Sequence, residues 1–162
     1  MIAQHQLTVT VTQDPFDVGR EVEALKQGRT DIGAICTFTG TVRDLTGSLK
    51  ALTLEHYPGM TERDLNTVAA EARNRFDLLG LTVIHRYGRL EPGQDIVLVV
   101  AAAPHRQNAF DGAMYMMDHL KTRAAFWKKE EHDGGQTEWV ASRTSDTDAA
   151  ARWSNQGQDV RP

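Results

Sequence analysis

Residues 81–110, "LTVIHRYGRLEPGQDIVLVVAAAPHRQNAF", contain two apolar runs rich in β-branched residues, followed by the start of a further element. Glu91, Pro92 and Gly93 form a turn signal between the two runs, which predicts an antiparallel hairpin. Apolar residues from Ala109 onward recur with helical spacing, so a helix is expected directly after the second strand. A hairpin that leads into a single helix is typical of an α+β domain and not of a doubly wound parallel sheet.

The rest of the chain has the same mixture of short strands and single helices. Alternating or continuous apolar residues predict further strands at residues 7–12, 31–42, 51–57 and 134–142, the second of them central in its sheet. Helices are expected at residues 17–28 and from Thr61, which is a good N-cap, with a last helical turn at 147–153. We therefore expect one α+β domain over residues 1–153, with a mixed or antiparallel sheet and about three helices, and a flexible tail at 154–162.

Composition excludes several classes of protein. The 162 residues carry a net charge of -4, which argues against non-specific nucleic-acid binding as the main function. No apolar run reaches the roughly 18 residues of a membrane span, and "MIAQHQLTVTVTQD" lacks the basic start and apolar core of a signal peptide, so we expect a cytoplasmic protein. The single cysteine, Cys36, and the scattered histidines show no metal-ligand spacing, and no nucleotide-binding glycine motif occurs. We expect no metal and no cofactor.

The segment "HLKTRAAFWKKE", residues 119–130, concentrates positive charge in an acidic chain. Lys121, Arg123, Lys128 and Lys129 occur there with no acidic residue between them. Complementarity to the negative end of a helix explains one or two of these cations more readily than four. Lys121 and Lys128 are seven residues apart and would share one helix face if the helix continued, but the sequence leaves that continuation open.

Three other groups of cations are candidates for anion binding, each with an ordinary structural alternative. His105 and Arg106 follow Pro104 where a strand gives way to a helix, and unpaired N–H groups there attract anions. The alternative is a solvated turn. Arg43 also follows a strand, although a lone loop arginine is usually solvated. Arg75 lies at the end of a predicted helix, where a cation also complements the helix dipole.

Several runs of sequence together resemble the large, catalytic subunit of molybdopterin synthase. They are "FTGTVR", "LTLEHYPGMTE", "EARNRF", "VIHRYGRLEPG", "PHRQNAF" and "MDHLKTRAAFWKKE", and the resemblance extends from about residue 31 to residue 153. It implies a fold of the α/β-hammerhead type. It also implies conversion of cyclic pyranopterin monophosphate, or precursor Z, into molybdopterin, with sulfur supplied by the C-terminal thiocarboxylate of a small ubiquitin-like partner. The implied assembly is a heterotetramer with a central dimer of large subunits.

The resemblance also assigns roles to individual residues. Lys121 matches the lysine that meets the partner's C-terminus, and Lys128 matches a second functional lysine, so both are expected to be catalytic. Phe126 and Trp127 are expected to pack and to fix these lysines. His105 and Arg106 are expected to serve the active site of the neighbouring large subunit if the pocket is shared. The residues expected to bind the phosphate and the pterin are Arg43, His105 and Arg106, with Phe38, Arg75, Met117 and Arg143 as further lining.

Two departures from the family pattern stand out. Ala125 occupies a position where many relatives have proline, which predicts a less rigid exit from the helix, and "AAPHR" lacks a serine before His105. The alternative to an enzyme is a non-catalytic module that binds a ubiquitin-like tail or a phosphorylated metabolite in the same basic pocket. The presence of both Lys121 and Lys128 disfavours this alternative, because binding alone would tolerate arginine.

Overall fold

Two four-stranded sheets carry the fold, which the computed structural model describes over residues 5–141 and 144–155. The first sheet contains β1 (Gln6–Thr12), β2 (Ala34–Thr41), β4 (Gly80–Arg86) and β6 (Asp95–Ala103). Its strand order is β1-β4-β6-β2, with β1 parallel to β4 and the other two pairings antiparallel. The predicted hairpin is confirmed, because β4 pairs with β6 in a register that places Leu81 opposite Ala101.

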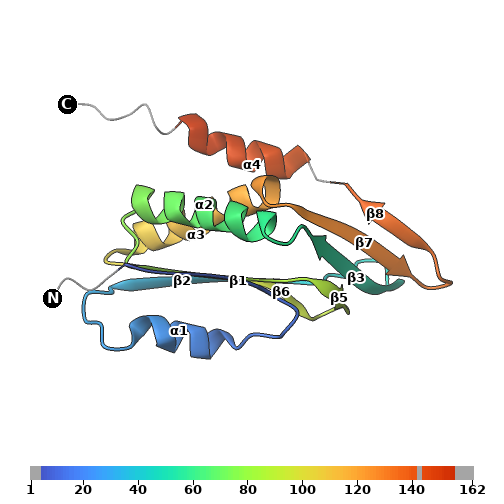
Figure 1. Cartoon of the computed structure of the whole chain (residues 1–162), viewed down its shortest axis with the longest axis horizontal. Helices are drawn as coiled ribbons and strands as arrows, with labels where there is room; N and C mark the ends of the chain where they lie inside the picture. The colour runs from blue at the N-terminus through green and yellow to red at the C-terminus, as the bar shows by residue number, and fades with distance from the viewer. Residues whose placement is uncertain (1–4, 142–143, 156–162) are drawn as a thin grey trace.

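The second sheet is antiparallel throughout and extends from one end of the first (Figure 1). It contains β3 (Leu49–His56), β5 (Gly88–Leu90), β7 (Phe126–His132) and β8 (Thr137–Val140), in the order β5-β3-β7-β8. The run that predicted one strand after residue 80 is divided at Tyr87. Gly88 adopts a φ of 90°, which is easily accessible only to glycine, and the chain there passes from the first sheet into the second.

Four helices surround the sheets in the described part of the chain, where about three were expected. They are α1 (Val18–Lys26), α2 (Met60–Arg75), α3 (Arg106–Arg123) and α4 (Thr144–Asn155). Figure 1 shows α1 on one face of the first sheet, α2 and α3 on the other face, and α4 over α2 and α3. None of the described helices is long and apolar enough to cross a membrane.

The predicted last helical turn is a helix of 12 residues. It is longer than predicted because it packs on the rest of the domain, and sequence periodicity alone does not reveal that contact. Trp153 is only 6% exposed and packs its ring against Phe76 and Tyr115. The helix continues to Asn155 and so includes the first two residues of the predicted tail. The rest of that predicted tail, residues 156–162, lies outside the described residues.

Strand alternation divides the core between the two faces of the first sheet. On β4, Leu81 and Val83 face α2 and α3 in the largest cluster, whereas Ile84 packs with Leu25 of α1 on the opposite face. The same alternation points His85 toward α3. A third cluster, around Leu52, Leu54 and Leu90, fills the junction with the second sheet.

Two local predictions are wrong. The strand predicted to be central, β2, lies at the edge of its sheet, because β4 and β6 are apolar on both faces and take the middle positions. Thr61 is not the N-cap of α2. Gly59 holds that position with a φ of 86°, and its N–H donates to Glu62 Oε2 at 2.6 Å, while Thr61 is the second residue of the helix and is fully buried.

Candidate active site

The two candidate catalytic lysines lie on different elements. Lys121 is exposed in the last turn of α3, which ends at Arg123, and Lys128 is partly buried in β7. Between them Ala124 is extended, with φ -88° and ψ 138°, so the helix does not continue. The open question of a shared helix face is therefore settled against it, and tertiary structure must bring the two amines together.

His85 lies close enough to both lysines for their charges to lower its pKa. Its ring is 5% exposed and stacks on Phe126 with 3.7 Å between ring centroids and 19° between ring planes. Its Nδ1 lies 2.8 Å from the Arg86 carbonyl oxygen, to which it donates, since a carbonyl oxygen only accepts. Burial, with smaller contributions from the charges of Lys128 and Lys121, lowers the pKa of His85 to about 4 against the opposing effect of that hydrogen bond. The imidazole is thus neutral near pH 7, and the positive charges of both lysines disfavour its protonation.

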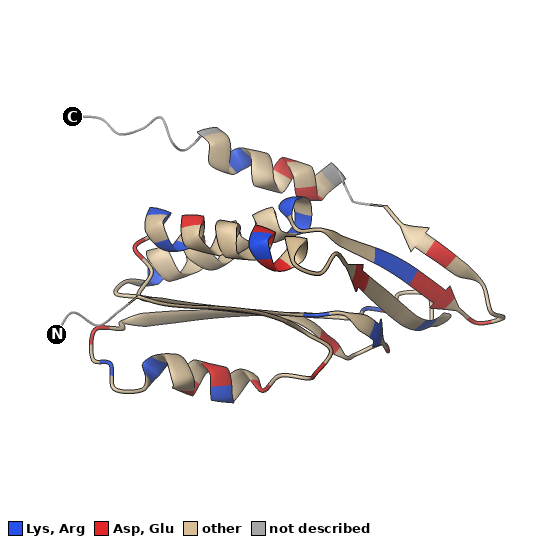
Figure 2. Cartoon of the chain, in the orientation of Figure 1, with Lys and Arg blue, Asp and Glu red and all other residues tan. Residues whose placement is uncertain are grey.

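The other two cations of the segment have structural partners. The guanidinium of Arg123 donates to Glu71 Oε1 at 2.9 Å, and this hydrogen bond lowers the pKa of Glu71. The ammonium group of Lys129 lies 5.8 Å from the centre of the Trp139 ring. Figure 2 shows positive residues at the end of α3 and at the start of β7, with acidic residues further along the strand. Arg123 and Lys129 thus have structural contacts, and a catalytic role for Lys121 and Lys128 stays a prediction.

The two aromatic residues of the segment differ in role. Phe126 packs on His85 and fixes the start of β7, which confirms its predicted packing role. Trp127 is 48% exposed, because neighbouring residues of a strand point to opposite faces. The prediction that Trp127 packs to fix the lysines is wrong for this chain.

Three further predicted residues lie at the same end of the domain. Met117 is 7% exposed and one helical turn before Lys121, on the same face of α3. Phe38 lies on β2, opposite Val99, and its ring is 40% exposed on the face of the sheet that α3 covers. Arg43, two residues after the end of β2, is exposed, whereas its neighbour Val42 is buried.

His105 and Arg106 lie at the opposite end of α3. Sixteen residues separate His105 from Lys121, which corresponds to roughly 24 Å along a helix. His105 is the N-cap, its side chain makes no capping hydrogen bond, and the first turn has no acidic residue. The first N–H groups of α3 are therefore available to an anion, but one chain does not bring them to the lysines.

Arg75 is occupied by contacts within the domain. Arg75 donates to the Trp153 carbonyl oxygen at 2.9 Å, and its guanidinium lies 5.4 Å from the centre of the Tyr115 ring. These contacts hold α4 against α2 and α3. Arg143 lies outside the described residues.

Sequence reasoning missed His85 and the buried role of Thr61. The only signal for His85 was one polar residue in an apolar strand, "LTVIHRY", which also fits a core histidine. The sequence around Thr61 predicted a helix N-cap and not a buried residue. The contacts of both residues are made across tens of residues of sequence, so no local pattern contains them.

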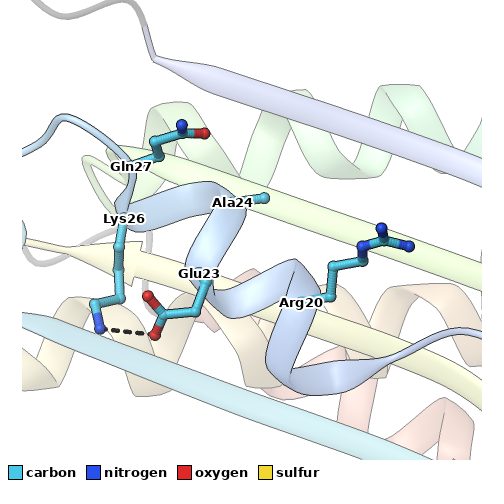
Figure 3. A pocket seen from close by; sticks show the side chains of 5 residues that line it. All are labelled: Arg20, Glu23, Ala24, Lys26 and Gln27. Carbon is cyan, nitrogen blue, oxygen red and sulfur yellow. Dashed lines mark hydrogen bonds and ion pairs between the residues drawn. The ribbon is translucent and has the colours of Figure 1, made fainter.

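Two shallow hollows of the surface lie elsewhere. Figure 3 shows one beside α1, where Lys26 Nζ pairs with Glu23 Oε1 at 3.0 Å. The other is lined by His5, Arg73, Asn74 and Asp77. Neither includes a predicted site residue. Over residues 5–141 and 144–155, no three His, Cys, Asp or Glu side chains are arranged to hold a metal ion.

Comparisons with known proteins agree with this geometry. Residues 11–123 match the family model described as MoaE protein. The chain is 53% identical to the molybdopterin synthase catalytic subunit of Mesorhizobium japonicum over 152 residues, which cover 93% of this chain and 96% of that protein. It is 50% identical to the subunit of that name from Pseudomonas aeruginosa, over 91% of this chain and 99% of that protein.

Solved structures show the same relationship. The molybdopterin biosynthesis MoaE protein from Burkholderia ambifaria superposes with a TM-score of 0.79 at 45% identity, covering 92% of this chain and 99% of that one. Molybdopterin synthase from Staphylococcus aureus superposes with a TM-score of 0.71 at 26% identity, over 87% and 99% of the two chains. The family model covers Lys121 and ends at the last residue of α3. The chain belongs to the MoaE family, the catalytic subunits of molybdopterin synthase.

Proposed function

We propose that this chain catalyses the conversion of precursor Z to molybdopterin, with sulfur from the thiocarboxylate of a small ubiquitin-like partner. The observation that carries the proposal is that Lys121 and Lys128 both lie close enough to His85 for their charges to lower its pKa, so the two lysines belong to one site. Family membership supports it independently. The reaction is proposed to take place in the cytoplasm.

The two lysines suit the charges that develop in this reaction. Attack at the thiocarboxylate carbonyl places negative charge on oxygen or sulfur, and fixed cations at short range stabilise that charge. Lys121, exposed at the end of α3, is proposed to meet the partner's C-terminal tail. Lys128, partly buried in β7, is proposed to hold charge in the intermediate and to move protons as C–S bonds form.

The substrate's phosphate requires a separate group of cations. Arg43, His105 and Arg106 are proposed to bind the phosphate and the pterin, since arginine pairs well with phosphate oxygens. His105 and Arg106 are too far along α3 to reach the lysines of their own chain, which favours a pocket shared by two copies. We therefore propose a dimer of this chain, with one small partner at each end of a heterotetramer. Phe38, Arg75, Met117 and Arg143 are proposed as further lining.

A reconstituted reaction tests the proposal. The purified chain, mixed with precursor Z and the thiocarboxylated partner, should form molybdopterin, which is measured as its fluorescent oxidation product. Lys121→Ala should abolish product and retain partner binding, while Lys129→Ala, on the same strand as Lys128 but stacked on Trp139, should retain product. Binding of the partner's tail without any product from the unaltered chain would instead favour the non-catalytic module.

A further inference from the structure

The connection between α3 and β7 sets the position of one catalytic lysine relative to the other. Only Ala124 and Ala125 separate the end of α3 from the start of β7. The Ala124 N–H donates to Leu120 O at 3.4 Å, and the Phe126 N–H donates to Ala124 O at 3.0 Å. These local contacts tie the connection to itself but not to the rest of the domain.

Thr61 ties the connection to α2. Its side chain is fully buried, and its Oγ1 lies 3.0 Å from the Ala125 carbonyl oxygen, 64 residues away in the sequence. Thr61 Oγ1 also accepts a hydrogen bond from the Tyr57 N–H at 3.1 Å. A helical threonine commonly bonds the carbonyl four residues earlier, and Tyr57 O lies 3.1 Å from Oγ1, but one hydroxyl has one proton to donate. The buried Ala125 contact is what distinguishes this threonine from an ordinary helical one.

His85 contacts the next residue from another element, β4. Its ring stacks on Phe126 from β4, while Thr61 holds Ala125 from α2. Two consecutive residues of the connection are thus fixed by two different elements of the domain. The junction is clamped at the point where a small rotation would move Lys128 relative to Lys121.

We infer that Thr61 is a positioning residue for the sulfur transfer, because its hydrogen bond to the Ala125 carbonyl, together with the His85 stack on Phe126, sets the spacing of Lys121 and Lys128. This inference rests on the proposed function. Displacement of a catalytic group by about 1 Å can lower a rate about a hundredfold, so the loss of one such contact has a measurable cost.

Ala125 makes the inference testable in the reverse direction. Proline at this position would stiffen the connection from within. Ala124, at φ -88° and ψ 138°, already has the conformation that a residue before proline prefers. In the described part of the chain no hydrogen bond from the Ala125 N–H is found, so proline would remove none. Ala125→Pro should therefore replace the constraint that Thr61 supplies from outside.

Four variants separate positioning from folding. Thr61→Val removes the hydroxyl at nearly constant shape and should lower kcat by roughly 10- to 100-fold, with KM for precursor Z and partner unchanged. Thr61→Ser keeps the hydroxyl and should stay within about threefold of wild type, as should Ala125→Pro, on the same reasoning. The double variant Thr61→Val with Ala125→Pro should recover most of the lost kcat. Unchanged kcat in Thr61→Val, equal losses in the valine and serine variants, or no recovery beside an active Ala125→Pro would overturn the inference.

Amide exchange gives a readout that does not depend on turnover. In Thr61→Val the backbone amides of residues 126–128 should exchange faster than in wild type, and Ala125→Pro should restore their protection. If the wild-type chain forms no molybdopterin, the proposed function fails, while exchange still reports on the clamp. Equal exchange at residues 126–128 in wild type and Thr61→Val would overturn the clamp itself.

Discussion

His85 predicts a specific pH dependence of stability. In the folded chain its pKa is about 4, against an ordinary value of 6.5, because burial and the nearby Lys128 and Lys121 disfavour the imidazolium. Below pH 6.5 the unfolded chain therefore binds a proton that the folded chain does not. The contribution of neutral His85 to the free energy of unfolding is fully present above pH 6.5 and is lost as the pH falls toward 4. Between pH 7.5 and 5 the loss from His85 amounts to about 2 kcal/mol.

Chemical denaturation over this pH range measures the effect. The free energy of unfolding of wild type should fall between pH 7.5 and 5, and His85→Phe should remove about 2 kcal/mol of that fall. Phenylalanine keeps a ring stacked on Phe126 but does not titrate. A lower free energy of unfolding of this variant at every pH would not affect the comparison, which uses only the change of that free energy with pH. His119, whose pKa burial also lowers, is the matched control, and His119→Gln should leave the His85 contribution in place. An identical pH slope in wild type and His85→Phe would refute the reasoning.

Two further predictions concern the docking of α4 and the sharing of the pocket. Asp118→Ala should lower the free energy of unfolding, measured by urea titration, by about 2 to 3 kcal/mol. The reason is that the buried Trp153 Nε1–H, which donates to Asp118 Oδ2 at 2.7 Å, would lose its acceptor. A loss below about 0.5 kcal/mol would contradict this. Co-expression of Arg106→Ala and Lys121→Ala chains, each inactive alone, should restore about a quarter of wild-type product, because half the dimers are mixed and each has one intact pocket. No recovery would show that each chain uses its own Arg106.

The sequence predicted those parts of the fold that depend on local periodicity. The β4–β6 hairpin and α3 follow from alternation and helical spacing, and both are present. The edge position of β2 and the division of the chain at Tyr87 depend on which strand pairs with which, and this information is spread over the whole chain. The length of α4 depends on a contact surface for Trp153 that only the folded core supplies.

The candidate site was predictable in its residue types but not in its geometry. Four cations without an acid marked the segment, yet only the structure shows that Arg123 belongs to Glu71 and Lys129 to Trp139. The sequence did not predict His85 as a site residue, because a buried histidine in an apolar strand has no distinctive sequence pattern. The influence of two lysines on its pKa arises from the packing of β4 against β7, which are about 40 residues apart in the chain.

Single-turnover formation of molybdopterin tests the central claim most directly. The wild-type chain and the Lys121→Ala, Lys128→Ala and Lys129→Ala variants are each mixed with precursor Z and excess thiocarboxylated partner, after far-UV circular dichroism has shown equal folding. We predict product from wild type and from Lys129→Ala, loss of at least a hundredfold in rate for Lys121→Ala, and a marked loss for Lys128→Ala. A wild-type rate in Lys121→Ala would contradict the account.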